Sequence, residues 1–126
     1  MPDSKQIRSA VETYVRSFNE QDKQAFLGVF ADGVQQIDPV GSAPNVGRQA
    51  LSTFWDAVFG QWRKIDFRVK DLIVTGDEAA LVFHITQSNG SAATEIDGID
   101  VFQVDDTGRI ALIKGYSDPD HVRSRD

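Results

Sequence analysis

Residues 79–104, AALVFHITQSNGSAATEIDGIDVFQV, contain two long runs of strand-forming residues on either side of a tight turn. The first run covers Ala79 to Gln87 and the second covers Thr94 to Val104. Asn89-Gly90 lies between the runs and is a strong hairpin signal. The stretch therefore predicts two antiparallel strands, and the segments around it can be placed relative to this hairpin.

The neighbouring segments continue the same sheet. In residues 65–74, Ile65, Phe67 and Val69 alternate with charged residues, as in a strand with one apolar face. Residues 109–116 come after another turn signal and are predicted to form a further strand. The second half of the chain is thus a run of strands joined by short turns.

The N-terminal half has a helical period instead. Apolar residues at i, i+3, i+4 and i+7 spacing over 7–18 predict an amphipathic helix, and residues 25–30 carry a second, shorter one. A short strand over 34–38 follows, and Gly47-Arg48 opens a third helix. Helices followed by hairpin-linked strands predict an α+β domain, with three N-terminal helices on one face of a mostly antiparallel sheet.

Composition limits what the chain can be. Residues 1–126 have the length of one domain and are 40% hydrophobic, so we expect a single unit with a polar tail from about residue 118. The net charge of -6 argues against nucleic acid as a partner. With no cysteine and two histidines, we expect no metal and no cofactor. No apolar run is long enough to span a membrane, so we expect a soluble, cytoplasmic protein that does not bind membranes.

The strands carry apolar side chains on both faces, as in Leu81-Val82-Phe83 and in Ile99 with its neighbours Val101 and Phe102. The helices can cover only one face of the sheet, so a monomer would leave the other apolar face in water. We therefore predict a homodimer through the outer face of the sheet.

Asp38 is the first candidate for acid-base chemistry. It ends a short extended run, and Pro39 disfavours helical geometry at Asp38. The following turn residues, including Gly41, stop the strand and place the carboxylate at the rim of a structured element. A simple solvated turn aspartate is the alternative interpretation.

Tyr14 and Asp100 are two further candidates. Tyr14 belongs to the apolar stripe of the first helix, so its hydroxyl points into the domain, either to a backbone carbonyl or to a ligand. Asp100 shares one strand face with Phe102 and Val104. If that face is the inner one, burial keeps the Asp100 carboxyl protonated and makes it a hydrogen-bond donor. If the opposite face is inner, Asp100 is solvated.

Several segments recur in the order expected of one known family. They are Val11-Glu12-Thr13-Tyr14-Val15, Phe30-Ala31-Asp32-Gly33, Asp38-Pro39-Val40-Gly41-Ser42, Gly47-Arg48, Phe54-Trp55 and Ile99-Asp100-Val101-Phe102. Over roughly residues 7–117 this order resembles the delta-5-3-ketosteroid isomerases. The resemblance implies a cone-shaped α+β fold with an apolar cavity, which is shared with nuclear transport factor, scytalone dehydratase and SnoaL-type polyketide cyclases.

The resemblance also implies site residues. It makes Asp38 the general base, Tyr14 an oxyanion-hole donor and Asp100 a second donor in its protonated form. The implied activity is that of a steroid delta-isomerase, which moves a double bond of a 3-oxo-delta-5-steroid, or of a similar hydrophobic β,γ-unsaturated ketone, into conjugation. The residues expected to contact this small hydrophobic substrate are Phe54, Trp55, Phe83 and Phe102.

Two positions depart from the family pattern. Trp55 stands where the family usually has a tyrosine that bonds to the oxyanion tyrosine, and indole donates but cannot accept a hydrogen bond. Ser117 stands where the family has a large aromatic residue near the base. The alternatives are therefore a SnoaL-like polyketide cyclase or dehydratase, and a non-catalytic module that binds steroids or other apolar ligands.

Overall fold

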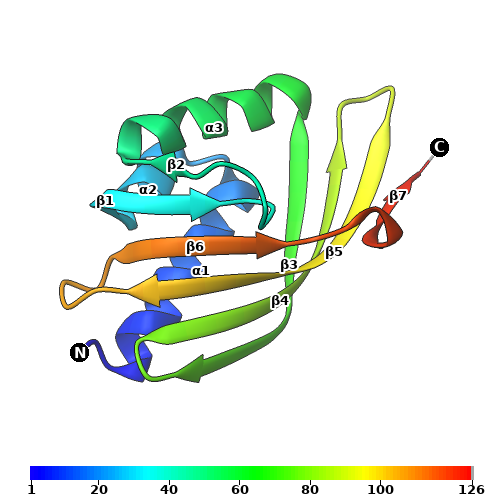
Figure 1. Cartoon of the computed structure of the whole chain (residues 1–126). Coiled ribbons are helices and arrows are strands. Elements are labelled where there is room, and N and C mark those ends of the chain that lie inside the picture. The colour runs from blue at the N-terminus through cyan, green and yellow to red at the C-terminus, as the bar shows by residue number, and fades with distance from the viewer. Residues whose placement is uncertain (126) are drawn as a thin grey trace.

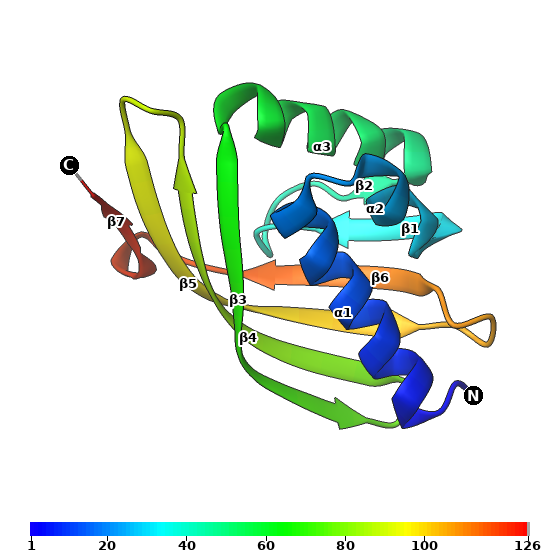
Figure 2. The ribbon, with the colours of Figure 1, turned by 180° about the vertical axis from the view of Figure 1, so that it is seen from behind.

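The structure, a computed structural model, describes residues 1–125. Its elements are α1 (Ser4–Glu20), α2 (Lys23–Gly28), β1 (Phe30–Ile37), β2 (Asn45–Val46), α3 (Arg48–Gln61), β3 (Lys64–Thr75), β4 (Glu78–Ser88), β5 (Ala93–Val104), β6 (Ile110–Tyr116), the 3-10 helix η1 (Pro119–His121) and β7 (Val122–Ser124). In Figure 2, α1 runs diagonally across the sheet, and α2 and α3 lie beyond its C-terminal end, beside β1. The α+β prediction, with N-terminal helices packed on a mostly antiparallel sheet, is confirmed.

Six strands of the sheet follow the order β2-β1-β6-β5-β4-β3, and β7 pairs with β5 off this path. The pair β1 and β6 is parallel, and every other described pair is antiparallel. In β3 the register shifts between Val69 and Asp71, an irregularity of the kind that bends a strand. Figure 1 shows the long strands β3, β4 and β5 curving together. The curved sheet encloses space beneath the helices.

The central hairpin forms as predicted from β4 and β5. Asn89 shapes its turn, because the Asn89 side-chain oxygen accepts hydrogen bonds from the backbone N–H groups of Ser91 and Ala92. Leu81 and Phe102 are buried on its inner face, and Leu81 pairs directly with Asp100. The Phe102 face of β5 is therefore the inner face, which decides between the two alternatives for Asp100.

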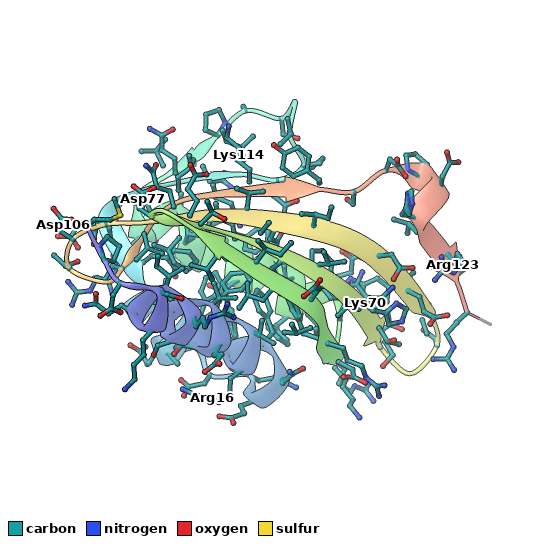
Figure 3. The ribbon with its side chains drawn as sticks, turned by 90° about the horizontal axis from the view of Figure 1, so that it is seen from below. Arg16, Lys70, Asp77, Asp106, Lys114 and Arg123 are labelled. Carbon is teal, nitrogen blue, oxygen red and sulfur yellow. The ribbon has the colours of Figure 1, made fainter. Side chains whose placement is uncertain are left out.

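Helix α1 begins with a capping box, in which the Asp3 carboxylate accepts a bond from the Gln6 N–H and the Gln6 side chain accepts one from the Asp3 N–H. From this start the apolar stripe faces the sheet. Its buried members are Ile7, Ala10, Val11, Tyr14, Val15 and Phe18. Viewed from below in Figure 3, Arg16 points away from the sheet. The helix thereby places Tyr14 in the interior.

Two segments differ from the sequence expectation. The strand predicted over 34–38 begins earlier, at Phe30, as β1, so the helix predicted over 25–30 ends at Gly28. The tail beyond residue 118 is exposed, yet Val122–Ser124 forms β7 and pairs with β5, with Glu95 opposite Arg123. Because β5 extends past the end of β6, its free edge is available for a returning strand.

Candidate active site

Neighbouring strands bring the two candidate carboxylates close together. Asp38 follows the last residue of β1, where Ile37 lies opposite Lys114 of the parallel strand β6. The next residue of β6, Gly115, pairs with Asp100 of β5. The loop after Asp38 is tied to the same place, because the Val40 N–H donates to the Gly115 carbonyl at 2.9 Å. Asp38 and Asp100 thus lie on either side of a glycine that separates them.

Tyr14 reaches the same region from α1. Its side chain is 4% exposed, and its ring packs edge-on against Phe102 and Phe18, each with ring centroids 5.2 Å away. Burial raises the pKa of the Tyr14 hydroxyl well above its usual value, and the nearby carboxylates of Asp100 and Asp38 raise it further. The hydroxyl therefore keeps its proton near neutral pH and is able to donate a hydrogen bond.

Asp100 is 5% exposed among apolar neighbours. Burial raises the pKa of its carboxyl well above the usual range, and the charge of Asp38 adds to this effect. Burial also raises the pKa of Asp38. The larger pKa shift belongs to Asp100, so of the two carboxyls Asp100 holds its proton to the higher pH.

All three groups line one cavity of about 150 Å³. Tyr14, Asp38 and Asp100 supply polar atoms, and Gln87 and Ser117 are also among the lining residues. The remaining wall is mainly apolar and includes Phe18, Phe54, Ile65, Phe67, Phe83 and Ile96. Two carboxyl groups and one phenol thus share a small, largely apolar space.

The four predicted contact residues separate into two groups. Phe54 and Phe83 line the cavity. Trp55 and Phe102 are not among its lining residues, because Trp55 packs on Phe18 and Phe59 in the core and Phe102 lies behind the Tyr14 ring. Phe102 therefore packs against Tyr14 rather than lining the cavity.

Other lining residues were absent from the sequence prediction. Ile85 and Gln87 continue the inner face of β4 that begins at Leu81 and Phe83, so period-two alternation is the signal that identifies them. Tyr116 also lines the cavity, at the point where the chain leaves β6, next to Ser117, whose position near the base the family resemblance had implied. A second, outer hollow of about 450 Å³ shares Phe83, Tyr116 and Ser117 with the cavity. The small side chain of Ser117 therefore lies where the two spaces meet.

Within residues 1–125, no group of three or more His, Asp or Glu side chains is arranged to hold a metal ion. None of the helices in this described part of the chain combines the length and apolarity needed to cross a membrane.

The fold and the matching family define the class of protein. The architecture is the nuclear-transport-factor-like fold, as expected from the resemblance. Residues 11–113 match the family model of the SnoaL-like domain, so the chain belongs to the SnoaL-like domain family. In sequence it is similar to the steroid Delta-isomerase of Nocardioides simplex, with 25% identity over 116 residues, which covers 92% of this chain and 93% of that relative.

Solved structures have the same fold at lower sequence identity. RV0760c from Mycobacterium tuberculosis has a TM-score of 0.89 and 20% identity and covers 99% of this chain and 100% of that chain. It has also been solved in complex with estradiol-17beta-hemisuccinate. The Delta 5-3-ketosteroid isomerase from Mycobacterium sp. has a TM-score of 0.86 and 22% identity, covering 95% and 98% of the two chains. The epoxide hydrolase/cyclase-like enzyme SalBIII, with a TM-score of 0.88 and 21% identity, covers 97% and 98%. Isomerases, steroid-binding proteins and a cyclase-like enzyme therefore share this architecture.

Proposed function

We propose that this protein is an isomerase that moves the double bond of a hydrophobic β,γ-unsaturated ketone, such as a 3-oxo-delta-5-steroid, into conjugation with the carbonyl. The observation that carries the proposal is that Asp38, Tyr14 and Asp100 line one apolar cavity. The similarity to a steroid Delta-isomerase over most of the chain supports the same assignment.

In this mechanism the Asp38 carboxylate removes a proton from the carbon between the carbonyl and the double bond. The electron pair moves onto the carbonyl oxygen, which gives a dienolate. Tyr14 and protonated Asp100 donate hydrogen bonds to that oxygen, and the surrounding apolar side chains exclude water that would weaken those bonds. Asp38 then returns its proton to the far carbon of the former double bond, and a conjugated enone results.

The raised pKa of Asp38 suits this role, because burial makes the carboxylate a stronger base than an exposed aspartate. The raised pKa of Asp100 suits a donor. The cavity of about 150 Å³ is smaller than typical ligand sites of about 300–1,000 Å³. We therefore expect it to hold the reacting end of the substrate, while the rest extends past the lining residues of α3 (Phe54, Val58) and of the β4–β5 hairpin (Gln87, Ile96).

The first prediction is tested by adding a β,γ-unsaturated 3-ketosteroid and following the growth of enone ultraviolet absorbance. We expect turnover by the wild-type protein and a loss of about 100- to 10,000-fold in Asp38→Asn, because the amide cannot accept the proton. Asp120→Asn, in the exposed tail, is the matched control and keeps full activity.

The same assay separates the alternatives. Unchanged turnover in Asp38→Asn contradicts the base assignment. Saturable binding of the steroid without absorbance growth indicates a non-catalytic binding module instead. If the protein neither binds nor turns over the steroid, the result favours the polyketide cyclase interpretation.

A further inference from the structure

Gly115 has an unusual position between the two carboxylates of the site. It lies on β6, directly opposite Asp100 of β5, and its carbonyl accepts the Val40 N–H in the loop that follows Asp38. Along β6, position 115 faces the same side of the sheet as Ile113, which is buried on the inner face, and the opposite side from Lys114. A side chain at 115 would therefore point into the space beneath the helices.

That space is already filled by the Asp38 carboxylate. A methyl carbon built on Gly115 would lie 2.6 Å from the Asp38 Cγ and 3.2 Å from Oδ2, and closer still to Oδ1. Carbon atoms in contact are normally about 3.5–4.0 Å apart. The Asp38 carboxylate thus lies against the bare backbone of Gly115, in the room that any other residue would occupy.

The neighbouring Gly98 of β5 provides a contrast. A methyl carbon there would meet the Phe83 ring at 2.7 Å and the Tyr116 backbone carbonyl at 2.8 Å, so substitution would disturb the sheet itself. At Gly115 the three nearest atoms all belong to the Asp38 carboxylate. This group is the end of a side chain and can rotate away, so a methyl at 115 moves the carboxylate and leaves the backbone in place.

We propose that Gly115 is a positioning residue for Asp38: its missing side chain lets the carboxylate lie across β6, facing the same space as Tyr14 and Asp100. This inference rests on the proposed function for its consequence in catalysis, but its geometric part concerns only where the Asp38 carboxylate lies. Any larger residue at 115 pushes the base off the strand and out of line with the two donors.

The test substitutes Gly115→Ala and uses Gly33→Ala as a matched control, because Gly33 is also a strand glycine but has nothing within 4 Å of an added methyl. A displaced base loses its alignment, so we expect kcat for the enone-forming reaction to fall about 10- to 100-fold in Gly115→Ala, with a much smaller change in KM. Gly33→Ala keeps the wild-type kcat.

A second readout does not depend on turnover. The Asp38 carboxyl carbon is followed by NMR during a pH titration and assigned by its loss in Asp38→Asn. We expect its midpoint to move down toward the ordinary aspartate range in Gly115→Ala but not in Gly33→Ala, because the displaced carboxylate is more solvated. An unchanged midpoint in a folded Gly115→Ala protein overturns the inference.

The two readouts distinguish failure of the proposed function from failure of the inference about Gly115. Absence of turnover in the wild-type protein contradicts the proposed function, whereas the titration still decides the role of Gly115. Should Gly115→Ala fail to fold, the double variant Asp38→Ala/Gly115→Ala decides: recovery of folded protein supports the inference, since the clashing carboxylate is gone, and continued misfolding overturns it.

Discussion

Asp38 and Asp100 are the same residue type in one small cavity, yet their surroundings give them different protonation states. Burial penalises both charged forms, and ionising the second carboxylate also costs repulsion from the first. The stronger shift at Asp100 follows from its place on an inner strand position, while Asp38 lies at the end of a strand next to a loop. Asp100 therefore holds its proton to a higher pH than Asp38, which is what the proposed roles of donor and base require.

The shift at Asp100 also predicts a pH dependence of stability. The folded-state pKa of Asp100 is raised above its unfolded value, so the folded state binds the extra proton and stability falls as pH rises from the unfolded pKa toward the folded one. Asp100→Asn cannot ionise and lacks this slope. At pH 7 we expect the variant to be more stable than wild type by about 1 kcal/mol or more, measured by denaturant unfolding.

The two curves should converge below about pH 4, where the unfolded aspartate is protonated as well. Asp120→Asn, an exposed carboxylate, serves as the control and keeps the wild-type slope. Parallel curves of stability against pH for wild type and Asp100→Asn would show that the folded structure does not disfavour the charged form of Asp100.

At the scale of elements, side-chain contacts add to the backbone pairing that joins β7 to β5. Arg123 of β7 contacts Asp97 of β5 at 2.9 Å, and His84 of β4 contacts the same carboxylate at 2.8 Å. The hydrogen bonds from His84 and Arg123 lower the pKa of Asp97 to about 2. This charged group lies on the outer face of the sheet, where a strand of three residues has little apolar surface to bury.

We therefore predict that Arg123→Ala loosens β7 without unfolding the domain. Because the Arg123 and Asp97 side chains are partly exposed, the effect should be small, about a two- to five-fold faster amide hydrogen exchange in residues 122–124. The same exchange should rise at high salt, which screens the pair.

Arg16→Ala is the control, since Arg16 points into solvent from α1, well away from Arg123 (Figure 3). It removes an equal charge and should leave the β7 exchange rates as in wild type. Equal acceleration in both variants would mean that overall charge, rather than the contact with Asp97, holds the strand.

At the scale of the whole molecule, part of the outer face of the sheet, away from the charged group at Asp97, carries exposed apolar side chains. Ile73 is 57% exposed and Ile99 is 41% exposed, and their strand partners, Ala80 and Val82, belong to the same face. Water contact with such a surface is unfavourable, which is the basis for the predicted homodimer.

The prediction is that the wild-type protein sediments as a dimer in analytical ultracentrifugation and that Ile99→Glu shifts it to the monomer, because a buried, unpaired charge opposes association. Ser9→Glu, on the exposed side of α1, adds the same charge and should keep the dimer. A wild-type protein that stays monomeric at high micromolar concentration contradicts the use of this face.

Local patterns were sufficient for much of the fold and of the candidate site. The apolar stripe of α1 identified the inward side of Tyr14, and alternation in β5 placed Asp100 with Phe102, although it left open which face is inner. The same alternation in β4 would have identified Ile85 and Gln87 as lining residues. These features depend on periods of a few residues, which a sequence displays directly.

Other features depend on contacts between segments distant in the chain. The pairing of β7 with β5, and the position of Trp55 in the core behind the cavity, follow from how the sheet curves and where the helices land. The room for Asp38 over Gly115 is of the same kind, since it arises from a parallel pairing between β1 and β6, which are separated by most of the chain. The sequence does not distinguish Gly115 from other strand glycines, because its role depends on which segment packs beside it.

The sequence by itself therefore determined the three helices, the five longer strands and the α+β class, because periodicity is a local property, and its resemblance to a known family suggested the roles proposed for Asp38, Tyr14 and Asp100. Only the tertiary structure decided which face of β5 is inner, that Tyr14, Asp38 and Asp100 share one cavity, and that an absent side chain at 115 leaves space for the base. Those facts depend on strand register and packing, which bring together groups that are far apart in the chain.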